Sequence, residues 1–180
     1  LKYIPECSIY SENQAKNVIL EMRNNFIKDG SGCYKVSVKQ DVNENSKNLP
    51  VVYNTFPTSS MDLEQNQPIG NGGVWFIFVD EFGSRVEDPV ENIPLELELG
   101  YDFIPSAWGK GFATEVTTAM IEFCKKQELA PKLVAYTDKD NIASHRVLLK
   151  NGFVQLPGFF KYLGLEDTLK FELELEIKQL

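Results

Sequence analysis

The sequence has no long apolar run, few cysteines and one histidine, and each scarcity argues against a class of protein. A membrane-spanning helix needs about 20 apolar residues, whereas the longest run, residues 74–79, has the length of a strand. The three cysteines are far apart and form no C-x-x-C motif. No signal peptide is visible either, so reduced thiols in a cytoplasmic or nuclear protein are expected. With one histidine and no clustered acidic ligands, no metal site is expected.

Positive charge is also scarce. The chain carries 18 Lys and Arg against 26 Asp and Glu, a net charge of -8. This balance argues against nucleic acid as the main partner. It would suit a cationic substrate, although acidic surfaces also serve solubility. The 180 residues, 43% of them apolar, are expected to form one globular domain over 1–180 that buries about 70% of its unfolded surface.

Residues 95–115 predict a strand, a glycine-bearing loop and a helix. Residues 95–103 alternate apolar with polar or small side chains, which is typical of a strand with one buried face. Pro105 ends this strand, and a helical pattern starts after Gly111. A helix start offers unpaired amides and the positive end of the helix dipole, so an anion fits there.

Gly109 and Gly111 lack a Cβ, so a phosphate could approach the main chain closely. The dinucleotide fingerprint G-x-G-x-x-G is not met, because position 114 is Thr. A purely structural turn therefore stays open as the alternative.

The remaining elements are predicted from periodicity and turn residues. Residues 74–79 predict a fully buried strand, and Asn141 is expected to cap a helix over 142–150. Other expected elements are a helix from residue 11, strands over 34–39, 51–53, 133–136, 153–162 and 168–177, and loops over 55–67 and 82–94. The last two strands are expected to pair antiparallel across a turn at 164–167.

Two motifs carry a resemblance to a known family. They are W-G-K-G-F-A-T-E at 108–115 and N-I-A-S-H-R-V-L-L-K-N-G-F at 141–153. In this order they resemble the GNAT superfamily of acetyl-CoA-dependent N-acetyltransferases, nearest to the branch typified by the ribosomal-protein N-terminal acetyltransferases. The match is good over residues 95–153 and poor over the first 90.

The resemblance implies an α/β fold with a mixed, mostly antiparallel sheet. A central parallel strand pair would be splayed around acetyl-CoA, with helices on both faces. The implied reaction moves an acetyl group from acetyl-CoA to a primary amine of a small molecule or a peptide N-terminus, with a backbone N–H stabilising the oxyanion. No membrane partner is expected, and a homodimer is left open.

The resemblance also assigns residues to the coenzyme. The main chain of residues 101–104 would bind the pantetheine arm, and the loop from Trp108 would bind the pyrophosphate. Trp108 stands where the family motif has Gln or Arg, a departure common in this branch. The full predicted set is Tyr101, Asp102, Phe103, Ile104, Trp108, Gly109, Lys110, Gly111, Phe112, Ala113, Thr114, Asn141 and Ser144.

Leu148 marks a gap in the second motif. Many family members have a tyrosine there that protonates the departing CoA thiolate. Helical spacing puts Asn141, Ser144 and Leu148 on one face, so Ser144 could take over the contact to the thiolate. Two alternatives stay open: Ser144 only makes room for the coenzyme, or Leu148 marks a weakened enzyme or a non-catalytic module that binds CoA or a protein partner.

The acceptor amine must lose a proton before it attacks. This costs about 4–5 kcal/mol at pH 7 for a lysine and about 1 for an α-amino group. Glu98, ahead of Glu96, is the candidate base on the strand over 95–103, and a solvated carboxylate is the alternative. His145 is expected to be an exposed helix residue, with a base role as the alternative. The aromatic residues Trp75, Tyr101, Phe159, Phe160 and Tyr162 would wall an acceptor pocket or belong to the core.

Overall fold

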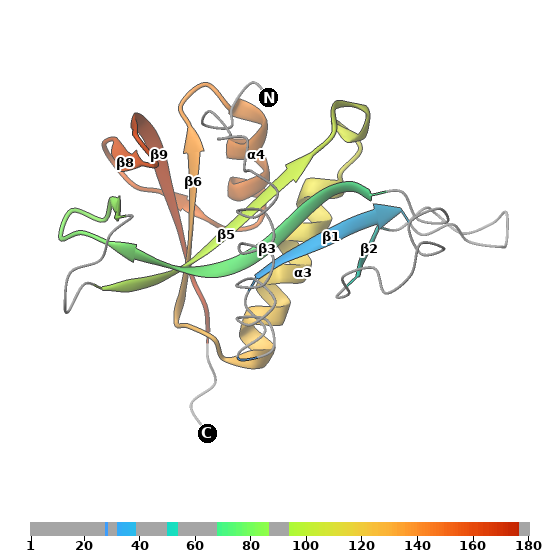
Figure 1. Ribbon diagram of the computed structural model, residues 1–180, viewed down its shortest axis with the longest axis horizontal. Helices are drawn as coiled ribbons and strands as arrows, with labels where there is room; N and C mark the ends of the chain where they lie inside the picture. The colour runs from blue at the N-terminus through green and yellow to red at the C-terminus, as the bar shows by residue number, and fades with distance from the viewer. Residues whose placement is uncertain (1–27, 29–31, 39–49, 54–67, 87–93, 177–180) are drawn as a thin grey trace, which may run out of the picture.

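A computed structural model describes residues 28, 32–38, 50–53, 68–86 and 94–176. Within these residues the chain forms a nine-stranded sheet and two α-helices, α3 and α4 (Figure 1). Neither helix is long and apolar enough to cross a membrane. The elements in chain order are β1 (Gly32–Val38), β2 (Pro50–Tyr53), β3 (Pro68–Val79), β4 (Arg85–Val86), β5 (Leu95–Phe103), the 3-10 helix η1 (Pro105–Ala107), α3 (Phe112–Gln127), β6 (Lys132–Asp138), α4 (Ile142–Lys150), β7 (Val154–Gln155), β8 (Phe160–Tyr162) and β9 (Leu165–Glu174).

The sheet is mixed but mostly antiparallel. Its strand order is β2-β1-β3-β5-β6-β9-β7, with β4 on β3 and β8 on β9. The central pair, β5 and β6, is parallel, and the other pairs are antiparallel. The predicted α/β class, with a mixed, mostly antiparallel sheet and a central parallel pair, is therefore confirmed. Both described helices pack on the face of the sheet that carries Leu97 and Leu99.

The parallel contact between β5 and β6 is short. Only Leu97 pairs with Leu133 and Glu98 with Val134, although β5 continues to Phe103 and β6 to Asp138. Figure 1 shows the two strands moving apart toward the top of the view, with α4 drawn between their ends. The sheet thus opens at its centre, immediately after Glu98.

The main apolar core lies between the sheet and both described helices. Val116, Met120 and Cys124 of α3 and Leu148 of α4 are buried there against strand residues such as Leu99. Residues three and four apart share one face of a helix, which explains the stripe on α3. A smaller cluster of Ile77, Val79 and Val134, flanked by Trp75 and Tyr136, covers a separate part of the sheet.

Several predicted boundaries are confirmed. The strand at Leu95–Phe103 and the helix at Ile142–Lys150 form as expected, and α3 begins directly after Gly111. The last strands do pair antiparallel, but the turn lies at Leu163 and Gly164, because Tyr162 already pairs with Leu165. The helix from residue 11 and the loop over 55–67 lie outside the described residues.

Other predictions were wrong in detail. The middle of β5 is buried on both faces, since Leu97, Glu98 and Leu99 are each at most 3% exposed. Conversely, the run over 74–79 is not fully buried: Phe76 is 40% and Phe78 36% exposed. The loop expected over 82–94 contains β4. The expected interruption of the segment 153–162 at Pro157 and Gly158, in contrast, is confirmed, since it separates β7 from β8.

Two neighbouring leucines of α4 test this packing. Leu148 is 2% exposed and Leu149 is 54% exposed. Replacing a buried leucine by alanine removes apolar contacts and leaves a cavity, so Leu148→Ala should lower the free energy of unfolding by about 2–5 kcal/mol. Leu149→Ala should change it by about 0.5 kcal/mol or less. Urea denaturation of both variants measures this, and equal losses would contradict the assigned helix face.

Candidate functional site

The loop that follows β5 presents free main-chain amides at the start of α3. Gly111, the N-cap residue, has φ 89°, and Gly109 has φ 71°. Residues other than glycine adopt such positive φ angles at an energetic cost, so the backbone conformation itself explains both glycines. A Cβ at either position would meet no atom within 4 Å. No side chain in the described part of the chain caps α3. The Glu115 N–H donates to the Gly111 carbonyl, and the amides before it have no partner within the helix.

Trp108 ties this loop to the end of β5. Its indole Nε1 donates a hydrogen bond of 2.8 Å to the Phe103 carbonyl, while the ring is 57% exposed. The Trp at the first position of the loop motif is thus explained by a structural contact.

The edge of β5 that faces the opening is defined by the ladder with β3. Ile104 N–H donates to the Ile69 carbonyl at 2.9 Å. Since hydrogen-bonded pairs alternate in an antiparallel ladder, Asp102 and Ile104 direct their main-chain groups to β3. Leu99, Tyr101 and Phe103 direct theirs to the opening, where no strand among the described residues pairs with them. Of residues 101–104, only alternate members can offer their main chain to a ligand there.

The second motif lies at the start of α4, next to the opening. The Asn141 side chain accepts a hydrogen bond from Ser144 N–H at 3.2 Å, as predicted for a helix cap. His145, predicted to be exposed, is instead 9% exposed. Its Nε2 lies 3.0 Å from the Asp138 carbonyl, and its ring packs 5.5 Å from Phe171. That prediction failed because His145 falls on the inner face of α4.

Tyr101 and Ser144 approach each other from β5 and α4. Burial raises the pKa of the Tyr101 hydroxyl to about 12, and the nearby Ser144 side chain offsets part of the rise. The hydroxyl oxygen is buried, yet no atom of the described residues lies at a hydrogen-bonding distance and angle. Because an unpaired buried hydroxyl costs about 1–3 kcal/mol, this oxygen stands out as a group that a ligand could satisfy.

Glu98 lies at the last residue pair before β5 and β6 separate. It is 3% exposed; the alternative of a solvated carboxylate is therefore wrong. Oε2 accepts from Trp75 Nε1 at 2.9 Å and lies 3.3 Å from Arg85 Nη1. Burial raises the pKa of this carboxyl, while Arg85, Tyr162 and Trp75 lower it in part. The net rise makes Glu98 a stronger base than an exposed glutamate.

Glu96 occupies a different environment. Its carboxylate pairs with Lys170 at 2.6 Å and with Lys132 at 3.3 Å. Lys170 is only 2% exposed and also donates to the Gly83 carbonyl at 3.1 Å. Since its charge is matched by two lysines, Glu96 fits a structural ion pair better than a base.

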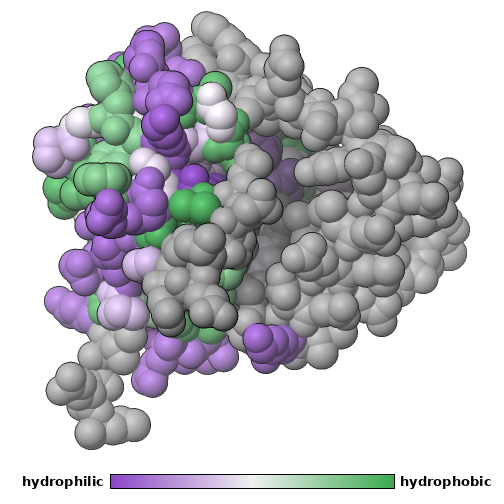
Figure 2. Space-filling view, turned by 60° about the vertical axis from the view of Figure 1, so that its left-hand side comes forward, coloured by the Kyte–Doolittle hydropathy of each residue, from purple (hydrophilic) through white to green (hydrophobic). Residues whose placement is uncertain are grey.

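The predicted aromatic residues do not form one wall. Trp75 and Tyr162 flank Glu98, and Tyr162 also accepts a hydrogen bond from Arg85 at 2.8 Å. Tyr101, three residues along β5, projects to the other face of the sheet, as residues of opposite parity in a strand must. Phe159 is 61% exposed. In Figure 2, which brings the side of β8 and β9 forward, hydrophobic residues gather in patches between hydrophilic ones.

Sequence reasoning missed three residues around the two carboxylates Glu98 and Glu96. Arg85 fell in an expected loop, and Lys170 in an expected strand where no role was assigned to it. Tyr136 stacks on Tyr162 with ring centroids 5.0 Å apart, and its hydroxyl donates to the Gly83 carbonyl at 2.7 Å. The sequence offered one signal for Tyr136. Alternation along β6 places its ring on the same face of the strand as Val134.

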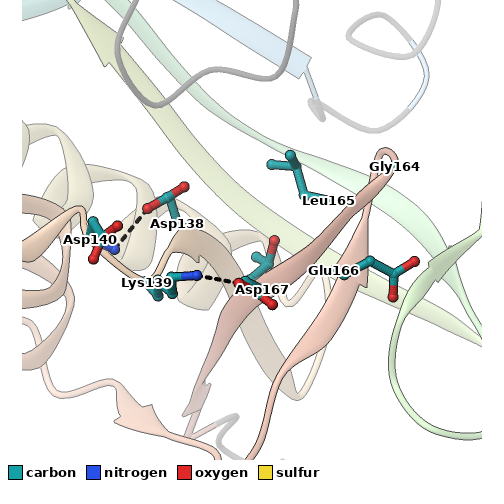
Figure 3. A pocket seen from close by; sticks show the side chains of 8 residues that line it. Asp138, Lys139, Asp140, Gly164, Leu165, Glu166 and Asp167 are labelled. Atoms are coloured by element: carbon teal, nitrogen blue, oxygen red, sulfur yellow. Dashed lines mark hydrogen bonds and ion pairs between the residues drawn. The ribbon is translucent and has the colours of Figure 1, made fainter.

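A separate surface pocket of about 340 Å³ lies between the turn after β6 and the hairpin of β8 and β9. Lys139 is paired with Asp167 inside it, and the Asp140 N–H donates to the Asp138 carboxylate at 2.7 Å (Figure 3). The pocket contains none of the predicted site residues. Its lining consists of Asp138, Lys139, Asp140, Gly164, Leu165, Glu166, Asp167 and Thr168. No group of three or more potential metal ligands occurs among the described residues.

Comparison with known proteins identifies the family. The acetyltransferase (GNAT) domain matches residues 51–154, more than half of the chain. The chain belongs to the GNAT acetyltransferase family. The resemblance seen in the two motifs is thereby confirmed.

Individual relatives are distant. The uncharacterised N-acetyltransferase YnaD of Bacillus subtilis is 26% identical over 161 residues, covering 89% of this chain and 69% of that protein. The ribosomal-protein-S5-alanine acetyltransferase of Vibrio fischeri has a similar structure, with a TM-score of 0.64 and 15% identity over 99% of this chain and 81% of that one. The NatC complex bound to Gag peptide and CoA includes a similar chain, with a TM-score of 0.54 and 18% identity over 93% and 84%.

The raised pKa of Glu98 predicts how stability depends on pH. The folded protein holds this proton more tightly than the unfolded chain, whose glutamate titrates near 4.5. The stabilisation that comes from this tighter proton binding at Glu98 is therefore fully present below pH 4.5, and it is lost as the pH rises through the raised pKa. Glu98→Gln cannot titrate, so its free energy of unfolding, relative to wild type, should rise with pH across that window.

Urea denaturation at several pH values between about 4 and 8 measures this difference. Glu174→Gln is the control, because Glu174 is exposed at the end of β9. Because the side chain is exposed, this substitution should change the free energy of unfolding by about 0.5 kcal/mol or less. A flat or falling difference for Glu98→Gln would contradict the burial of a carboxyl with a raised pKa.

Proposed function

We propose that this GNAT-family protein transfers an acetyl group from acetyl-CoA to a primary amine, at a peptide N-terminus or on a small molecule. The observation that carries the proposal is the separation of β5 and β6 after Glu98, next to the open glycine loop at the start of α3. The NatC chain of similar fold, in a complex with CoA and a peptide, supports the donor and the acceptor class by analogy.

The residues around the opening fit the coenzyme. The amides of Gly109, Gly111 and the first turn of α3 would bind the diphosphate, because hydrogen bonds to charged groups contribute about 1.5–3 kcal/mol each. The main chain of Tyr101 and Phe103 would bind the pantetheine arm as an added strand. Lys110, Phe112, Ala113 and Thr114 belong to the same loop and helix start, and Asn141 is the N-cap of α4, the helix that follows β6. Bound acetyl-CoA would supply the thioester that the amine attacks.

Two groups on β5 would assist the transfer. A backbone N–H that points into the opening would stabilise the oxyanion of the tetrahedral intermediate. Glu98 would accept the proton that the amine must lose, since its raised pKa strengthens it as a base. Its side chain is only 3% exposed, which favours proton transfer through an intervening water.

The reaction can be tested directly by thiol release. Acetyl-CoA is mixed with the protein and a panel of peptides, polyamines and amino-sugar antibiotics, and free CoA is measured with a thiol reagent. We expect faster turnover for α-amino groups than for lysine side chains, because the former lose a proton about 3–4 kcal/mol more easily at pH 7. Calorimetry that detects no binding of acetyl-CoA would overturn the proposal.

Gly111→Glu tests the diphosphate site. A carboxylate at the start of α3 would repel the diphosphate, so the affinity for acetyl-CoA should fall by at least tenfold, about 1.4 kcal/mol. Gly158→Glu is a matched control, because Gly158 also has a positive φ, 93°, and a Cβ there would likewise meet no atom within 4 Å. The control should bind acetyl-CoA like wild type. If both folded variants keep full affinity, the loop is not the diphosphate site.

A non-catalytic module that binds CoA or a protein partner is the second candidate. Leu148, which is 2% exposed, offers no acidic group, and Glu98 is already engaged by Trp75 and Arg85. This candidate is preferred if calorimetry detects binding of CoA while the whole amine panel remains unacetylated.

A further inference from the structure

The buried hydroxyl of Tyr101 has no acceptor at good hydrogen-bonding distance and angle among the described residues, although the Ser144 side chain lies close enough to lower its pKa. Its oxygen is shielded from solvent and lacks a hydrogen bond within the described residues. Tyr136 and Tyr162, in contrast, bond to the Gly83 carbonyl and to Arg85. A phenylalanine at position 101 would avoid the cost of a poorly paired hydroxyl, so the contacts of the described residues do not by themselves explain a tyrosine there.

The position of Tyr101 relates this hydroxyl to the opening in the sheet. Tyr101 lies three residues beyond Glu98, on the part of β5 that β6 no longer pairs with. Ser144 is in the first turn of α4, the helix that follows β6. The Tyr101 and Ser144 side chains therefore come close to each other from the two elements whose strands separate, on the face of the sheet that α4 covers.

A ligand held as proposed above would bring a particular atom to this place. With its diphosphate at Gly109–Gly111 and its arm along β5, it runs toward Glu98, where the opening closes. Its far end carries the thioester and therefore lies near Leu99 and Tyr101. Leu148, which is 2% exposed, supplies no polar group on α4, so the hydroxyls of Tyr101 and Ser144 are the candidate side-chain donors to the sulfur.

We propose that the Tyr101 hydroxyl, supported by Ser144, donates a hydrogen bond to the sulfur of the bound thioester. This inference rests on the proposed function. The hydrogen bond stabilises the electron pair that the sulfur takes when the carbon–sulfur bond breaks. The proton stays on the Tyr101 oxygen, because its pKa, raised to about 12, lies above that of an ordinary thiol.

Tyr101→Phe tests the proposal with a readout that is independent of turnover. The pKa of the thiol of bound CoA is measured from the ultraviolet absorbance of the thiolate during a pH titration. Loss of a hydrogen bond to the charged sulfur should raise this pKa by about one unit. The preference for CoA over desulfo-CoA should fall by about tenfold, and kcat should fall by at least as much. Ser144→Ala should show a smaller shift in the same direction.

Two controls separate this role from a structural one. Tyr136→Phe also removes a buried tyrosine hydroxyl, but one that bonds to Gly83, and it should leave the thiol pKa unchanged. Tyr101→Phe should be as stable as wild type or more stable in urea, because it removes an unpaired hydroxyl. A structural tyrosine would instead lose stability with no change in the thiol pKa.

The outcomes distinguish the two proposals. If wild type does not bind CoA, the proposed function fails, and the assignment of Tyr101 fails with it. If wild type binds CoA but the thiol pKa and the preference over desulfo-CoA are the same in Tyr101→Phe, only the assignment of Tyr101 is overturned. The same conclusion follows if Ser144→Ala shifts the thiol pKa and Tyr101→Phe does not.

Discussion

The short parallel contact between β5 and β6 is the constraint on which the rest of this structure depends. Two residue pairs hold the strands together, and the main-chain groups of Leu99, Tyr101 and Phe103 are then left without a strand partner among the described residues. Backbone N–H and C=O groups need hydrogen-bond partners when they are buried. A ligand that adds main-chain hydrogen bonds along β5, as proposed for the coenzyme, would satisfy these groups.

Alternation along β5 gives the opening two chemically different sides. Leu97, Leu99 and Tyr101 face the apolar core beneath α3 and α4. Glu98 faces a polar group on the other side, where Arg85 and Tyr162 surround its carboxylate. Because successive residues of a strand point to opposite faces, one strand separates the proposed base from the proposed sulfur ligand. The acceptor and the leaving group can thus be handled on different sides of one thioester.

The sequence predicted the parts of this site that depend on local rules. Pro105, Gly111 and Asn141 mark where β5 ends and where α3 and α4 begin, and each boundary follows from backbone preferences. The surroundings of Glu98 could not be predicted. Arg85 and Tyr162 lie 13 and 64 residues from Glu98 in the sequence, and only the tertiary fold brings their side chains to its carboxylate. The prediction that His145 is exposed failed for the same reason, since only the packing of α4 on Phe171 decides which face of the helix is buried.

The net negative charge of the chain is not concentrated around Glu98, the proposed base. Around Glu98 and Glu96, the cations Arg85, Lys132 and Lys170 already balance the carboxylates. A cationic amine would find no net negative charge to stabilise it there, and Arg85 would oppose its approach to Glu98. The pocket beside the β8–β9 hairpin, where Lys139 is the one cation among four carboxylates, is the more acidic surface. The overall charge of -8 thus gives no reason to expect a lysine-like acceptor, and the balance at Glu98 favours an amine that arrives uncharged, as an α-amino group does most readily.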